Sequence, residues 1–242
     1  FLDDSPLEEL YELTDEMNEA LGEGEIKVSE ISGKALGEAL YQKMFGSGGM
    51  AKIRNKTNRL KCANTLGQIT KSMIAFAGDH GAFPWHLDPG DKKHIFGKGN
   101  PEHLGTNFAL EDIRLSLGSP KTLHSPCDPD RKAIADYKGY SARENKPIPH
   151  AAISYGLCLG GDDQLSETIL GLTRNVSGDD LKGVKFLGNV MSGLKAHQGQ
   201  MSTSDGAVMQ VSNPEHLPEM VAFHTEAKGG NAPGPPSTKL ML

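Results

Sequence analysis

The clearest pattern in the chain is a run of apolar positions at helical spacing between residues 50 and 78. The apolar side chains recur every three to four residues, and they are Ile53, Leu60, Cys62, Leu66, Ile69, Met73 and Phe76. Such spacing places them along one face of an α-helix. We therefore expect one long helix over roughly residues 50–77, ended by Gly78-Asp79.

A second amphipathic helix is predicted near the start of the chain. Ser5-Pro6-Leu7-Glu8 is a capping-box pattern with proline at the first helical position. Helically spaced apolar residues follow it until Gly22, and they are Leu7, Leu10, Met17 and Leu21. We expect a helix at 6–21, a short strand at 25–31, and another helix that ends in the glycines of 46–49. Residues 1–49 would then form a helical arm.

The remainder of the chain alternates between turn clusters and short apolar runs. Leu110–Leu117 is predicted to be a short helix, and Ala151–Leu159, Lys185–Val190 and Ala207–Val211 are predicted to be strands. From Lys228 the sequence is rich in Pro and Gly, so an extended or disordered tail is expected unless a partner holds it. The apolar tip at 240–242 could act as an anchor. The expected division is an arm at 1–49, a domain at 50–227 and a tail at 228–242.

Charge is distributed unevenly along the chain. Residues 1–31 contain many carboxylates and a single base, Lys27, whereas residues 43–78 contain seven bases and no acid. Two interpretations are open. The two segments are separate solvated faces, or they meet, either within one subunit or between subunits.

Composition narrows the possible functions. The 242 residues carry a formal net charge of −6, which excludes a chain-wide nucleic-acid footprint. The longest apolar run, Met73–Ala77, is far shorter than the roughly 20 residues of a membrane span. Glycine, at 29 residues, favours many turns over an all-helical bundle. The chain begins at Phe1 without a signal peptide, so we expect a processed chain or a fragment.

The sequence contains no recognisable catalytic motif. The histidines lie among prolines and glycines without the spacing of a helical metal site, and the nucleophile elbow and the phosphate-binding loops do not occur. We therefore expect no enzyme activity and no cofactor, and replacement of His80, His86 or His124 should leave the function intact. The loop aspartates are expected to cap turns. A structural Ca²⁺ in one of these loops is the alternative.

The three cysteines allow at most one disulfide. Cys62 lies on the apolar side of the basic helix, Cys127 lies in a turn, and Cys158 lies in a predicted strand. Two of them could form a bridge in an exported protein, whereas all three would be buried thiols in a cytosolic one.

Several short blocks together resemble the bacterial type IV pilin-like proteins, which are related to the pseudopilins of type II secretion. The first block is Asn58-Arg59-Leu60-Lys61-Cys62-Ala63-Asn64-Thr65-Leu66-Gly67-Gln68-Ile69. The later blocks follow in the family's order: Gly81-Ala82-Phe83-Pro84, Pro126-Cys127-Asp128-Pro129, Ser154-Tyr155-Gly156, His197-Gln198-Gly199 and Ser204-Asp205-Gly206-Ala207-Val208. Residues 1–49 depart from the family, because they are polar and acidic where its members carry a hydrophobic anchor.

The resemblance implies an α+β fold, in which a long helix lies across a small antiparallel sheet. An apolar stripe on that helix needs such a sheet to cover it. In that arrangement the core residues of the helix are Leu66, Ile69, Met73 and Phe76. The resemblance also points to a Cys62–Cys127 disulfide, and Cys127–Cys158 is the competing pair.

We expect a structural subunit, pilin-like or pseudopilin-like, of an exported assembly in the periplasm, at the cell surface or outside the cell. Its partners would be copies of itself or other pilin-like subunits, with no nucleic acid. The candidate assembly residues are Leu7, Leu10, Met17 and Leu21 in the arm, and Lys52, Arg54, Lys56 and Arg59 in the long helix. One alternative is a secreted module that binds glycans or peptides on Trp85, Tyr137 and Tyr140. Another is a secreted hydrolase that uses loop His and Asp residues.

Overall fold

The computed structural model describes residues 49–212, 214–221 and 237–242, with side chains from Ile53 onward. The chain divides into two compact units, Phe1–Ala51 and Lys52–Leu242. The helices predicted within residues 1–48, the strand at 25–31 and the first part of the tail lie outside the described residues. Within the described ranges, no helix is both long enough and apolar enough to cross a bilayer.

Helix α3 runs from Gly49 to His80 and forms the long helix predicted from the apolar spacing. It contains no proline, and its larger buried apolar residues, Cys62, Leu66, Ile69, Met73 and Phe76, lie on one face. The helix continues past the predicted stop at Gly78. It ends at Gly81, where φ is 83° and the N–H donates to the carbonyl of Ala77 at 2.7 Å. The left-handed backbone, rather than glycine as such, marks the end of the helix.

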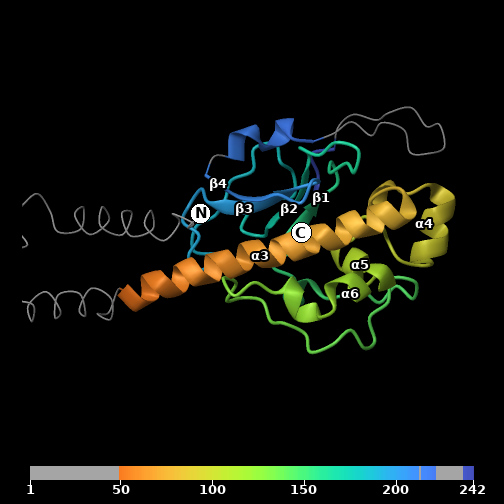
Figure 1. The fold of residues 1–242 in the computed structure, drawn as a ribbon, viewed down its shortest axis with the longest axis horizontal. Coiled ribbons are helices and arrows are strands. Elements are labelled where there is room, and N and C mark those ends of the chain that lie inside the picture. The colour runs from red at the N-terminus through yellow and green to blue at the C-terminus, as the bar shows by residue number, and fades with distance from the viewer. Residues whose placement is uncertain (1–48, 213, 222–236) are drawn as a thin grey trace, which may run out of the picture. The chain divides into compact units, whose positions relative to one another are not determined.

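Five strands form one antiparallel sheet in the order β4-β3-β2-β1-β5. Their bounds are β1 Tyr155–Cys158, β2 Ile169–Thr173, β3 Gly199–Thr203, β4 Val208–Val211 and β5 Leu240–Met241. The structure therefore confirms the α+β class, with a long helix packed on an antiparallel sheet. In Figure 1 helix α3 crosses the molecule diagonally, with the strands above it and helices α5 and α6 below it.

Both faces of the sheet are covered, because successive strand residues point to opposite sides. Leu157 and Leu170 pack in the cluster that contains the buried face of α3. Their neighbours Cys158 and Ile169 pack in a second cluster, which contains Phe186 and Leu217. The sheet is thus the middle of three layers.

Strand β5 closes one edge of this sheet. Met241 pairs with Leu157 and Leu240 pairs with Cys158. On the outer side, the Leu240 N–H donates to the Asp179 carbonyl at 2.7 Å, and the Leu181 N–H donates to the Thr238 carbonyl at 2.8 Å. A Cβ at Gly156 would lie 2.9 Å from the Met241 carbonyl oxygen, so β1 needs glycine there for this close approach of two backbones. The apolar tip of the chain is therefore held in the fold.

Strands β3 and β4 form a hairpin, and its turn lies in the block at 204–208 that carries part of the resemblance. Gly206 in the turn has φ of 93°, which favours glycine. The Asp205 carboxylate accepts hydrogen bonds from the Ala207 N–H at 3.0 Å and from the Thr203 hydroxyl at 2.6 Å.

Short helices and turns connect the long helix to the sheet. The helices are α4 Pro89–Phe96, α5 Leu104–Phe108 and α6 Glu111–Leu117, and the short 3-10 helices are η2 Pro84–His86, η3 Pro120–Leu123, η4 His150–Ala152 and η5 Pro214–Glu219. Helix α6 confirms the short helix predicted at Leu110–Leu117. Its first turn carries Glu111 and Asp112, which suit the positive end of the helix dipole.

The prediction of a strand at Lys185–Val190 is wrong. In the structure this segment makes only an isolated bridge between Phe186 and Val176, and Phe186 fills the second core cluster. The apolar run therefore reflects burial of side chains in a loop whose backbone pairs at one β-bridge and forms no strand.

Candidate functional site

The two halves of α3 have different surroundings. From Cys62 to Ala77 its inner face is buried in the core, whereas Ile53 and Leu60 are 51% and 60% exposed. The exposed half also carries Arg54, Lys56 and Lys61, all on the surface. In Figure 1 this part of the helix extends beyond the strands. The basic half of α3 is therefore the main accessible surface of a long rigid element.

One side of the basic half packs against other residues of its own unit, Lys52–Leu242. The Gln200 side chain donates to the Arg59 carbonyl at 2.9 Å. A Cβ on Gly193 would lie 3.2 Å from the Asn55 carbonyl, so the loop at 191–195 packs closely against this side. These contacts determine which face of α3 is covered and leave the opposite face, with Leu60, open to solvent.

A buried cluster of polar side chains joins α3 to the turn at 125–130. The Cys62 and Cys127 thiols lie near enough to shift each other's pKa. The Tyr155 hydroxyl donates to the Cys62 carbonyl at 3.2 Å and lies 3.5 Å from its sulfur. The interaction with Cys62 and then burial raise the pKa of the Cys127 thiol far above its ordinary value.

All three cysteines are free and buried in the structure. Cys158 belongs to the second core cluster, on the face of the sheet away from Cys62. The geometry therefore places Cys62 beside Cys127 and gives the alternative pair, Cys127–Cys158, no comparable contact. Burial raises the pKa of the Cys158 thiol to about 12, which makes it a packing residue rather than a nucleophile.

An ion pair anchors the same turn to the end of β2. Arg174 binds the carboxylate of Asp128 through Nε and one terminal nitrogen, both at 2.5 Å, and binds Asp130 at 3.0 Å. The Asp128 side chain is fully buried. Burial would raise the pKa of this carboxyl, but hydrogen bonds from Arg174 and Ser154 and the guanidinium charge together hold its pKa below the ordinary value.

The histidines are distributed over separate contacts. His80 Nε2 lies 2.9 Å from an Asp112 carboxylate oxygen, and His86 Nε2 lies 2.9 Å from the Leu159 carbonyl oxygen. The Nε2 atoms of His103 and His150 are 3.2 Å apart. Among the described residues, no three His, Cys, Asp or Glu side chains come together as metal ligands do. Nothing in this arrangement forms a nucleophile, a base and a residue that orients the base.

The loop aspartates cap turns. In five of them a carboxylate oxygen accepts the N–H of the residue two positions later, and they are Asp128, Asp136, Asp162, Asp180 and Asp205. This is the geometry of an Asx-turn. Their oxygens are therefore used by the protein's own backbone.

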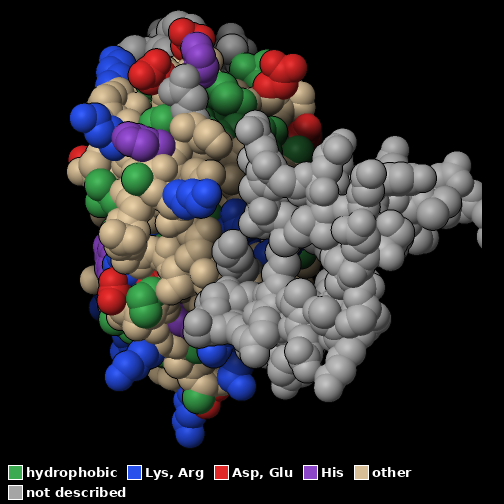
Figure 2. All heavy atoms as spheres, turned by 90° about the vertical axis from the view of Figure 1, so that its left-hand side faces the viewer, with side chains coloured by type: hydrophobic (Ala, Val, Ile, Leu, Met, Phe, Trp, Pro, Cys, Tyr) green, Lys and Arg blue, Asp and Glu red, His purple; other side chains and the backbone are tan. Residues whose placement is uncertain are grey.

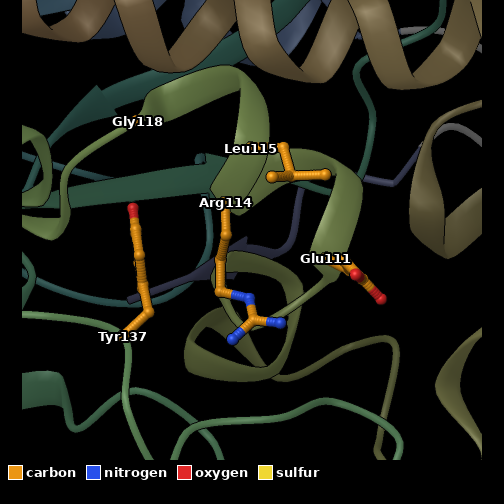
Figure 3. A pocket seen from close by; sticks show the side chains of 5 residues that line it. All are labelled: Glu111, Arg114, Leu115, Gly118 and Tyr137. Atoms are coloured by element: carbon orange, nitrogen blue, oxygen red, sulfur yellow. The ribbon is translucent and has the colours of Figure 1, made fainter.

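The aromatic residues considered for ligand stacking are mostly covered. Trp85 is buried in the core. The Tyr137 ring has the Arg114 guanidinium over it at 5.8 Å, and both line an open hollow of about 330 Å³ with Glu111, Leu115 and Gly118. Figure 3 shows Arg114 and Tyr137 side by side in this hollow. Burial raises the pKa of Tyr137 to about 12. Because Arg114 occupies a face of the ring, the hollow lacks a free aromatic platform for a sugar.

The remaining assembly candidates lie partly outside the described residues. Nothing is described for Leu7, Leu10, Met17 and Leu21, or for the side chain of Lys52. Arg54, Lys56 and Arg59 all lie on the basic half of α3, with Arg59 only partly exposed. Figure 2 views the molecule from the end at which α3 begins in Figure 1, and shows several Lys and Arg side chains at its lower end, with others at the upper left and near the middle.

Sequence reasoning missed the Asp128–Arg174 pair and the exposure of Leu60. The pair joins residues 46 positions apart, and no local pattern connects them. The exposure could have been inferred from the basic residues Arg59 and Lys61, which flank Leu60 on both sides.

Comparison of the chain with protein-family models, with curated proteins and with solved structures gives no match. The fold by itself still defines a class. It is an α+β protein in which a long helix at the start of the described chain packs on an antiparallel sheet, an arrangement compatible with a pilin-like protein.

Proposed function

We propose that this chain is a non-enzymatic structural subunit, similar to pilins and pseudopilins, of an exported or cell-surface assembly. Its partners would be copies of itself or other pilin-like subunits. The observation that carries the proposal is the division of α3 into a core half and an exposed half. A helix that is half buried in its own subunit can join that subunit rigidly to a neighbour.

The exposed half supports this proposal through its chemistry. Ile53 and Leu60 are large apolar side chains on the surface, surrounded by bases. Single exposed apolar residues are normal, but two that lie seven residues apart share one face of a helix. An apolar pair within a charged rim is typical of a surface that binds another protein.

The experiment is microscopy and sedimentation of the protein from its native source. A structural subunit is expected as filaments, sheets or defined oligomers. A protein that stays monomeric at high concentration, and is absent from any isolated assembly, would contradict the proposal.

Export of the protein would predict a second observation, a disulfide bond. In an oxidising compartment the adjacent Cys62 and Cys127 thiols are expected to form a disulfide. Peptide mapping without reductant should then find these two cysteines linked and Cys158 free. Three free thiols in the native protein would remove the case for export.

A further inference from the structure

The exposed face of α3 forms a continuous stripe along most of the helix. We define this exposed stripe by its members, which recur every three to four residues: Ile53, Thr57, Leu60, Asn64, Gln68 and Lys71. Three bases flank it, namely Arg54, Lys56 and Lys61. No acidic residue occurs from Lys43 to Gly78, so the charged groups along the stripe all have one sign.

The arm sequence has the complementary pattern. Its predicted helix at 6–21 places one set of residues at alternating spacings of three and four, and this seam consists of Leu7, Leu10, Thr14, Met17 and Leu21. Such spacing is typical of a helix that packs lengthwise on another helix. The surrounding residues are largely carboxylates, so the arm matches the two apolar residues of the stripe, Ile53 and Leu60, and the bases that flank it.

The lengths of the two surfaces also agree. The seam from Leu7 to Leu21 spans about 21 Å at 1.5 Å per residue. The part of the stripe from Ile53 to Gln68 spans about 22 Å by the same measure. A helix at 6–21 can therefore cover Ile53 and Leu60 in one contact.

We propose that the arm helix at 6–21 of one copy packs lengthwise on the exposed stripe of α3 in a second copy. This inference rests on the proposed function, because it names the contact through which copies associate. Each copy brings one arm and one stripe, so the contact is head-to-tail and can continue from copy to copy. The apolar seam provides most of the affinity. The opposite charges determine the direction in which the two helices pair and the rate of association.

Two substitutions in the full-length chain test the contact. Leu60→Glu puts a carboxylate in the stripe, and Leu10→Glu puts one in the seam. Each is expected to weaken self-association at least tenfold, as measured by sedimentation. Leu115→Glu is the matched control, because Leu115 is a 73% exposed leucine on α6 and lies outside the stripe. The control should associate as the wild type does, and thermal unfolding should show all three variants folded.

Mixing the two variants distinguishes exchange between copies from folding back within one copy. A Leu60→Glu copy keeps a normal arm, and a Leu10→Glu copy keeps a normal stripe. The exchanged contact therefore predicts a one-to-one pair that grows no further. Wild-type association should also weaken as salt is raised. An arm that folds back on its own helix predicts no pair in the mixture, and that result would overturn the inference.

The outcomes separate the contact from the proposed function. Wild-type association that is unchanged by Leu60→Glu and by Leu10→Glu overturns the contact alone. A wild-type protein that does not associate at all overturns both.

Discussion

At the scale of single residues, the buried Asp128 carboxylate does more than cap a turn. It accepts two hydrogen bonds from Arg174 and one from the Asp130 N–H, so its oxygens satisfy three donors at once. The turn at 125–130 also presents Cys127 to Cys62. The ion pair therefore positions the segment that approaches α3.

Replacement of Asp128 by Asn should destabilise the protein by about 3 kcal/mol. Removal of the buried partner leaves Arg174, which is only 15% exposed, with the largely exposed Asp130 as its remaining carboxylate. Urea unfolding at pH 7 measures the loss. Asp130→Asn is the control, since Asp130 is largely exposed and its contribution should be below about 1 kcal/mol. Equal effects of the two substitutions would contradict this role of Asp128.

The same carboxylate predicts a loss of stability in acid. Its pKa is lower in the folded protein than the roughly 3.9 of an unfolded chain, so its contribution is fully present above that value. The contribution is lost as the pH falls through the folded pKa. The stability difference between wild type and Asp128→Asn should therefore shrink below about pH 4. A difference that stays constant from pH 7 to pH 2 would show that Asp128 does not titrate in this way.

The roles of single residues could be predicted from the sequence where they depend only on neighbouring residues in the chain. Asp205 and Gly206 in the β3–β4 turn follow known turn preferences, and the structure uses them in that way. The contact of Cys62 with Cys127 came from the resemblance and not from any spacing. Contacts across the fold, such as Asp128 with Arg174, depend on how distant segments pack.

At the scale of elements, β5 has an effect larger than its two residues. Its backbone bonds to β1 on one side and to residues 179–181 on the other. Leu240 fills the second core cluster and Met241 fills the first. The two residues of β5 therefore contact both of the layers that cover the sheet.

Leu240→Ala should destabilise the protein by about 2–5 kcal/mol, because it removes a buried side chain and leaves a cavity. Amide hydrogens of β5 and of residues 179–181 should exchange faster in the variant. Leu187→Ala is the matched control, since Leu187 is partly exposed, and it should cost less than about 1 kcal/mol. If Leu240→Ala costs no more than the control, β5 does not contribute to the core as described.

Helix α3 and strands β1 and β4 were predictable, because their apolar patterns are strong and their ends carry turn residues. Strands β2 and β3 were not. All five residues of β3 are buried although their sequence is Gly-Gln-Met-Ser-Thr. Polar residues can lie there because Gln200 and Ser202 find partners on α3. No alternation of apolar and polar residues shows this in the sequence.

At the scale of the whole molecule, a Cys62–Cys127 disulfide would tie the start of the fold to its middle. Closing a loop of this length stabilises by about 4 kcal/mol in the chain-entropy model. Reductant should therefore lower the stability of the disulfide-linked protein by about that amount in urea unfolding. A Cys158→Ala variant should show the same dependence on reductant. An effect of reductant that requires Cys158 would indicate the Cys127–Cys158 pair instead.

The pairing of β5 with β1 also has a consequence for the order of events during synthesis. The two strands lie about eighty residues apart, so β1 leaves the ribosome long before its neighbour exists. Until residues 237–242 follow, the backbone of β1 on that side has no pairing partner. The edge of the native sheet at β1 can therefore close only after this segment has been synthesised, although β1 itself is made far earlier.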